Sequence, residues 1–167
     1  MAGPGFTSDE FRAALGRFAT GVTVLSVARD DGRPFGMTVN AFTSLSLQPP
    51  LVLVCVGRNA LSGAAIAARG RFGVSILRED QQALSRYFSE SNQDAESAER
   101  LGIRWRATEH GTPLVEHCLA QLECSLAATH DGGDHRILVG AVEHIVVGDG
   151  RPLLFYRGRY PALGPES

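Results

Sequence analysis

The sequence lacks several features that would place it in other classes of protein. Its 167 residues carry 16 Lys plus Arg against 18 Asp plus Glu, so there is no basic excess to neutralise the phosphates of a nucleic acid. No apolar run approaches the ~18 residues that a membrane span needs. The first ten residues have no basic region followed by an apolar stretch, so we expect no secretory signal. Neither a nucleic acid nor a membrane is an expected partner.

Cysteines are few. Cys55, Cys118 and Cys124 are odd in number and have no CxxC spacing, which argues against a disulfide framework and against a zinc site. Cys118 and Cys124 fall in one expected strand, about 20 Å apart at ~3.3 Å per residue, whereas the Cα atoms of a disulfide lie within about 7 Å. We therefore expect three reduced thiols and a reducing compartment, the cytoplasm.

Familiar catalytic signatures are missing as well. No GxGxxG follows the first expected strand, which argues against a Rossmann nucleotide site. The five histidines show neither HxH nor HExxH spacing, so no metal centre is expected. There is no GxSxG motif and no evident Ser/His/Asp grouping. The chemistry of this chain has to come from another source.

The sequence does have the composition of one globular domain. It is 44% hydrophobic and 20% charged, and we expect a single domain over residues 1–167 with its core at about residues 11–160. Thr7 and Glu10 have the spacing of a capping box. The apolar residues that follow at helical spacing predict an amphipathic helix that ends near Thr20-Gly21; they are Phe11, Ala14, Leu15 and Phe18.

Most of the remaining chain is predicted to be strand. Apolar and β-branched runs predict strands at residues 22–28, 35–46, 51–56, 72–77, 118–127, 137–147 and 153–156. Alternation within residues 118–127 places Gln121, Glu123 and Ser125 on a polar face. Short helices are expected at residues 61–68 and after Asp80. Residues 89–100 are expected to form a mobile, polar surface segment, with room for some helix in its second half. The pattern predicts a mainly β, antiparallel barrel with a few short helices.

Two segments are candidate binding sites on chemical grounds. Within Gly36–Ser46 the polar side of the expected strand is short and rich in hydroxyls, which would suit a flat heteroaromatic ligand and a phosphate. Gly57–Ser62 follows an apolar strand and opens a helix, where free amides could bind a phosphate. Each segment also has an ordinary explanation, a solvated strand face for the first and a helix cap for the second. His135 lies at an expected turn, where histidines are common.

The order and spacing of several motifs resemble a known family, the short flavin reductases. These NAD(P)H:flavin oxidoreductases serve two-component flavin-dependent monooxygenases. The resemblance spans about Phe11 to Tyr160, and the segments that carry it are Phe18–Val24, Gly36–Ser46, Pro49–Val56, Phe72–Leu77, Gly133–His135 and Pro152–Tyr160.

The resemblance implies a split β-barrel of the Greek-key, FMN-binding type that works as a homodimer. It implies FMN or FAD as the flavin, NADH or NADPH as the hydride donor, and a partner monooxygenase that receives reduced flavin. His135 would lie beside the nicotinamide as the catalytic residue, and no metal is implied. The flavin-binding residues carried over from the family are Thr38, Val39, Asn40, Ala41, Ser44, Cys55, Val56, Gly57, Arg58, Asn59, Ser62, Phe88 and Ser89.

Three alternatives remain open at this stage. A split-barrel oxidase of the pyridoxamine-phosphate oxidase type would retain FMN, and a non-catalytic carrier would hold flavin or haem without turnover. A structural β-barrel interaction domain would bind no flavin. A reductase must release its reduced flavin, so we expect modest flavin affinity and a pale purified protein.

Overall fold

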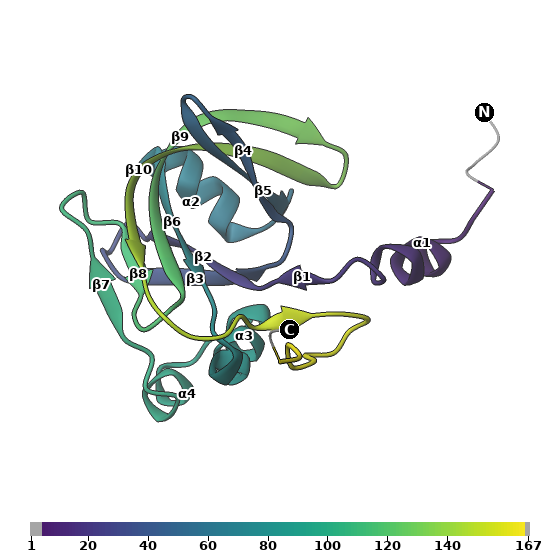
Figure 1. The fold of residues 1–167 in the computed structure, drawn as a ribbon. Coiled ribbons are helices and arrows are strands. Elements are labelled where there is room, and N and C mark those ends of the chain that lie inside the picture. Colours follow the sequence, from purple (N-terminus) through teal and green to yellow (C-terminus); the bar gives the residue numbers. More distant parts are fainter. Residues whose placement is uncertain (1–4, 166–167) are drawn as a thin grey trace.

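A seven-stranded antiparallel sheet forms the body of the protein in a computed structural model, which describes residues 5–165 (Figure 1). The strands follow the order β3-β2-β6-β9-β10-β5-β4. Their bounds are β2 (Thr23–Ala28), β3 (Pro34–Val39), β4 (Phe42–Leu47), β5 (Pro50–Gly57), β6 (Arg71–Ile76), β9 (Ala120–Gly132) and β10 (His135–Val147). The first four residues of the segment considered for a secretory signal lie outside the described residues.

Short elements complete the fold. Two further antiparallel pairs join β1 (Thr20–Gly21) to β11 (Leu154–Phe155) and β7 (Trp105–Ala107) to β8 (Pro113–Val115). The helices are α1 (Ser8–Leu15), α2 (Leu61–Arg69), the 3₁₀ turn η1 (Glu79–Gln81), α3 (Gln82–Ser89) and α4 (Ala95–Arg100). The predicted mainly β fold with a few short helices is confirmed. No described helix is long and apolar enough to cross a membrane.

The two edge strands of the large sheet, β3 and β4, are consecutive in the chain. Only Asn40 and Ala41 join them, so the two edges of the curved sheet approach one another at this connection. The hydrogen-bonded order of the described strands therefore has two ends and leaves a seam between them. The expected single extended stretch at residues 35–46 is broken into two strands at this seam.

Two apolar cores hold the layers together. The first packs α2 against the sheet, with Leu25, Ile66 and Phe72 all essentially inaccessible to solvent. The second lies between β2, α3 and the C-terminal segment, and it buries Leu77, Phe88 and Leu153. Since α3 and α2 belong to different cores, the sheet is covered on both faces near β2 and β3.

Helix α1 differs from the expectation at its C-terminal end. The capping box between Thr7 and Glu10 is present, but the helix ends at Leu15, where Gly16 caps it by donating its N–H to Arg12 and Ala14 carbonyls. None of its residues is buried, and the helix stands away from the body of the chain (Figure 1). The apolar stripe predicted for this helix is therefore present, but among the described residues only Phe6, which stacks on Phe11, covers part of it.

Strand β9 corrects a second expectation. Gln121 and Glu123, expected on a polar face, are 6% and 2% exposed. The cause is the β7–β8 hairpin, which packs across that face and brings Thr108 and Thr112 to Glu123. Each strand of this hairpin has three residues, too few for alternation to be recognised. Cys55, Cys118 and Cys124 are all free.

Candidate functional site

Strand pairing brings together residues from three of the predicted site segments. Strand β5 lies between β4 and β10, so Ala41 and Ile137 flank Cys55: the Cys55 N–H donates to the Ala41 carbonyl at 3.0 Å, and Cys55 is in register with Ile137. Two residues further along, Gly57 is in register with His135. The β3–β4 connection, the end of β5 and the start of β10 therefore meet at one end of the sheet.

The start of α2 adds backbone donors beside this end. Residues 58–60 link β5 directly to α2, whose N-cap residue Ala60 makes no side-chain capping bond. Amides in the first turn of a helix point outward and favour an anion. Ser62 can offer a ligand only its backbone, because its side chain is buried and its hydroxyl Oγ contacts the Met37 sulfur at 3.6 Å. Asn59 is exposed beside the same turn.

His135 is held by its neighbour in the turn between β9 and β10. Its Nδ1 lies 2.6 Å from the Asp134 carboxylate, and about half of the imidazole is exposed. The hydrogen bond from His135 lowers the pKa of the Asp134 carboxyl below its ordinary value. With Asp134 accepting at Nδ1, Nε2 is the imidazole nitrogen left for a ligand.

Other predicted residues serve the packing of the protein. The side chains of Val39 and Val56 are buried in the first core and can offer a ligand only backbone atoms. Thr38 donates to the Ser85 carbonyl at 2.7 Å and so joins β3 to α3. Phe88 is 2% exposed in the second core.

Two residues lie at the margins of the site. Ser89 is exposed at the end of α3, where its hydroxyl donates to the Arg86 carbonyl at 2.7 Å. Ser44 is exposed on β4 but lies three residues beyond Ala41, opposite Val52. The compact part of the site is therefore Asn40, Ala41, Cys55, Gly57 and His135.

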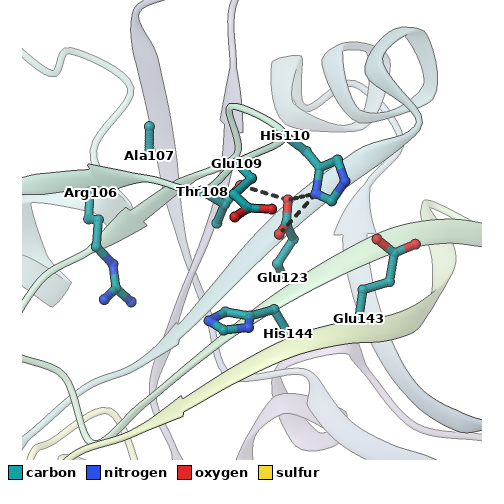
Figure 2. Close-up of a pocket in the computed structure, with 8 residues that line it drawn as sticks. All are labelled: Arg106, Ala107, Thr108, Glu109, His110, Glu123, Glu143 and His144. Carbon is teal, nitrogen blue, oxygen red and sulfur yellow. Dashed lines mark hydrogen bonds and ion pairs between the residues drawn. The ribbon is translucent and has the colours of Figure 1, made fainter.

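An open pocket of about 430 Å³ lies elsewhere, between the β7–β8 hairpin and β10 (Figure 2). His144 of its wall is nine residues along β10 from His135, about 30 Å at ~3.3 Å per residue. Its lining is charged and polar, and comprises Arg106, Ala107, Thr108, Glu109, His110, Glu123, Glu143 and His144. Sequence reasoning did not anticipate this cavity, because the hairpin that forms one wall was missed.

Glu123 is the buried acid of that wall. Thr108 and Thr112 donate to its carboxylate at 2.7 and 2.8 Å, and His110 Nδ1 lies 3.4 Å away. Burial alone would raise the pKa of this carboxyl, but the hydrogen bonds, with help from Arg71, outweigh it and lower the pKa. The acid is thus satisfied by the hairpin that it anchors. Within residues 5–165, no three His, Cys, Asp or Glu side chains converge to hold a metal ion.

The residues of the candidate site are better suited to binding a flavin than to holding a metal ion or to nucleophilic catalysis. They offer short polar groups, uncapped helix amides and a half-buried Cys55, with no Lys or Glu among them. Among known proteins, the family model of flavin reductase like domains matches residues 15–164, and the chain belongs to that family.

Individual relatives cover nearly the whole chain. The reductase subunit HsaB of a flavin-dependent monooxygenase from Mycobacterium tuberculosis is 44% identical over 160 residues, which is 94% of this chain and 83% of the relative. An NADH-dependent flavin reductase from a Rhodococcus species is 43% identical over 162 residues, 96% of this chain and 89% of the relative. The NADH:FAD oxidoreductase SgcE6 of Streptomyces globisporus, solved with NAD and FAD fragments, superposes with a TM-score of 0.86 at 35% identity, covering 95% and 94% of the two chains.

Proposed function

We propose that this protein is an NADH-dependent flavin reductase. It reduces FMN or FAD by hydride transfer and supplies the reduced flavin to a partner flavin-dependent monooxygenase. The observation that carries the proposal is the meeting of Ala41, Cys55 and His135 at one end of the sheet, in a chain of the flavin reductase family. The relatives named above as a reductase subunit of a monooxygenase and as an NADH-dependent flavin reductase support the same activity.

The role of the protein is to bind and orient the flavin and the nicotinamide, because these two molecules supply the hydride chemistry themselves. The uncapped amides at the start of α2 and the exposed Asn59 would hold the flavin phosphate. Asn40, Ala41 and Cys55 would line the ring and ribityl chain. Ser44, Ser89 and the hydrogen bond from Thr38 to Ser85 of α3 would lie at the margin. Asn40 and nearby backbone amides would stabilise negative charge on the reduced ring.

His135 would orient the nicotinamide. Asp134 holds its Nδ1, so Nε2 is free to contact the carboxamide or to hold a proton there. His135→Ala is expected to raise the KM for NADH and lower the rate while leaving the protein folded, since the residue is exposed. Unchanged NADH kinetics in this variant would remove His135 from the site.

The function is tested by following NADH oxidation with FMN, FAD, riboflavin or no flavin added to dialysed protein. Turnover that depends on added flavin is the expected result, and the rates rank the flavins. Turnover without added flavin, together with lasting yellow colour, would instead favour an oxidase that retains FMN. Flavin or haem binding without turnover would favour a carrier, and no binding at all would favour an interaction domain.

We propose further that the protein works as a homodimer and that α1 packs on the second copy. Four large apolar side chains in and beside this helix are 53–75% exposed: Phe6, Phe11, Leu15 and Phe18. A helix of eight residues has little stability in water by itself, so this stripe needs a cover. No other described element of the chain provides one.

Light scattering after size exclusion tests the dimer. We expect a mass of twice the 17.8 kDa chain for the wild-type protein. Replacing Phe11 and Leu15 by Ser should shift the mass toward the monomer, whereas Ala13→Ser in the same helix should not. A monomeric wild type, or a dimer that survives the double replacement, would remove α1 from the interface.

A further inference from the structure

The turn that carries His135 projects beyond the strand that supports it. Strand β5 pairs with β10 only as far as Gly57 opposite His135, and the turn residues 131–135 are all exposed. Gly133 opens the two-residue loop with φ +77°, as a tight hairpin loop of this kind requires. The sheet alone therefore fixes the base of the turn but not its tip.

Arg58, which directly follows β5, binds that tip. Its backbone N–H donates to the Asp134 carbonyl at 2.9 Å. Its guanidinium donates to the Gly133 carbonyl through Nε at 3.1 Å and Nη2 at 2.8 Å, and Nη2 also pairs with the Asp131 carboxylate. The two carbonyls that Arg58 binds stand on either side of Asp134. Arg58 therefore holds the peptide groups on both sides of Asp134 and fixes the backbone conformation of that residue.

The direction of the Asp134 carboxylate depends on that backbone, and the carboxylate in turn holds Nδ1 of His135 at 2.6 Å. We infer that Arg58 is a positioning residue that aims His135 through Asp134. This inference rests on the proposed function, since it concerns the orientation of the residue placed beside the nicotinamide. It also changes the role expected for Arg58 from its sequence position, because the guanidinium is directed to the turn rather than to a flavin phosphate.

The exposure of Arg58 makes a clean variant possible. Its side chain is 46% exposed, so Arg58→Met should fold, and it keeps both the aliphatic stem and the backbone N–H. Arg69→Met is a matched control, because Arg69 is also an exposed arginine that binds a backbone carbonyl and an aspartate, those of Arg29 and Asp30. Arg69 lies at the far end of α2 from the candidate site.

Arg58 could either position His135 or bind the flavin phosphate. Steady-state kinetics with FMN and with riboflavin, which lacks the phosphate, separate these two roles. For Arg58→Met we expect kcat/KM for NADH to fall by up to about a hundredfold, the loss that a ~1 Å misplacement of the bound reactants can cause, and by the same factor with both flavins. The KM for flavin should not change. A rise in flavin KM with FMN but not with riboflavin would make Arg58 a phosphate ligand and overturn the inference.

A double-mutant cycle tests the route through Asp134. Asp134→Asn should lower kcat/KM for NADH. Adding Arg58→Met to Asp134→Asn should cause little further loss of kcat/KM, since both changes act through the contact between Asp134 and His135. Fully additive losses would overturn this route. If wild-type protein oxidises no NADH with any flavin, the proposed function fails; if it is active and Arg58→Met matches it, only the positioning role fails.

Hydrogen exchange in the ligand-free protein gives a readout that is independent of activity. Amides of residues 132–135 should exchange faster in Arg58→Met than in wild type, because the tip of the turn loses the guanidinium contacts and keeps only the backbone hydrogen bond from Arg58. The same amides should be unchanged in Arg69→Met. Equal exchange in all three proteins would show that Arg58 does not hold the turn.

Discussion

Glu123 provides a sharp test of how the fold is held together. The carboxylate is 2% exposed and accepts hydrogen bonds from Thr108 and Thr112, which tie the β7–β8 hairpin to β9. Replacing Glu123 by Gln keeps the shape and one acceptor oxygen but removes the charge. Hydrogen bonds to charged groups contribute about 1.5–3 kcal/mol, against about 0.5–1.5 kcal/mol for neutral ones, so weakening these two should cost about 2 kcal/mol.

The effect should depend on pH in a defined direction. The pKa of Glu123 in the folded protein is below its ordinary value of 4.5. Its contribution to the free energy of unfolding is therefore complete at neutral pH and is lost as the pH falls through the lowered pKa of the folded state. The stability gap between wild type and Glu123→Gln should be widest near pH 7 and should narrow in acid.

Urea denaturation of both proteins at one concentration and a series of pH values measures this gap. In thermal denaturation, a loss of about 2 kcal/mol would lower Tm by roughly 4–8 °C for a chain of this size. Thr112→Val removes one of the two donors to Glu123 and serves as the control. It should lower the free energy of unfolding less in Glu123→Gln than in the wild type. Equal stability at pH 7, or a gap that does not change with pH, would refute this account of the buried acid.

Three further predictions concern packing and thiol chemistry. Gly140→Ala should destabilise the protein by about 1–3 kcal/mol, because the added Cβ would lie 2.4 Å from the Phe72 ring and 2.9 Å from Cys124; an unchanged Tm would contradict this packing. Phe88→Ala should cost about 3–5 kcal/mol in urea denaturation, since the ring is buried and packs edge-on against Trp105 at 5.6 Å between centroids; a loss below 1 kcal/mol would place Phe88 outside the core. Burial raises the pKa of Cys118 to about 11 and that of Cys124 to about 12, so neither should react with a thiol reagent at pH 8 until the protein unfolds; labelling of either in native protein, located by mass spectrometry, would contradict this.

Four of the longer strands, each with six or more residues, were predictable from the sequence. Alternation and β-branched runs located β2, β5, β6 and β10, because such strands carry a repeating apolar signal. The hairpin β7–β8 has no such signal. The hairpin covers one face of β9 and hydrogen-bonds to Glu123. The partners of Glu123 come from another part of the chain, and no local sequence pattern predicts a contact of that kind.

Helix α1 shows a different limit of prediction from the sequence. Its capping box is a local feature and was predictable, whereas the burial of its apolar stripe depends on what lies opposite. Phe11 and Leu15 have the spacing of a core-facing stripe, yet both are more than half exposed within the chain. Periodicity identifies a face that needs a partner but does not say whether the partner belongs to the same chain.

The candidate site was located only loosely because few of its side chains are free for a ligand. Val56 and Ser62 point into the protein, and the Arg58 guanidinium is bound to the turn. The groups that we propose for the flavin are few: Asn40, Ala41, Cys55, Asn59 and the backbone amides at the start of α2. Such a site makes few charge-assisted contacts, and those are the strong ones. Modest affinity is what a flavin reductase needs if its reduced product is to leave for a partner enzyme, so the sparse chemistry of the seam agrees with flavin acting here as a substrate.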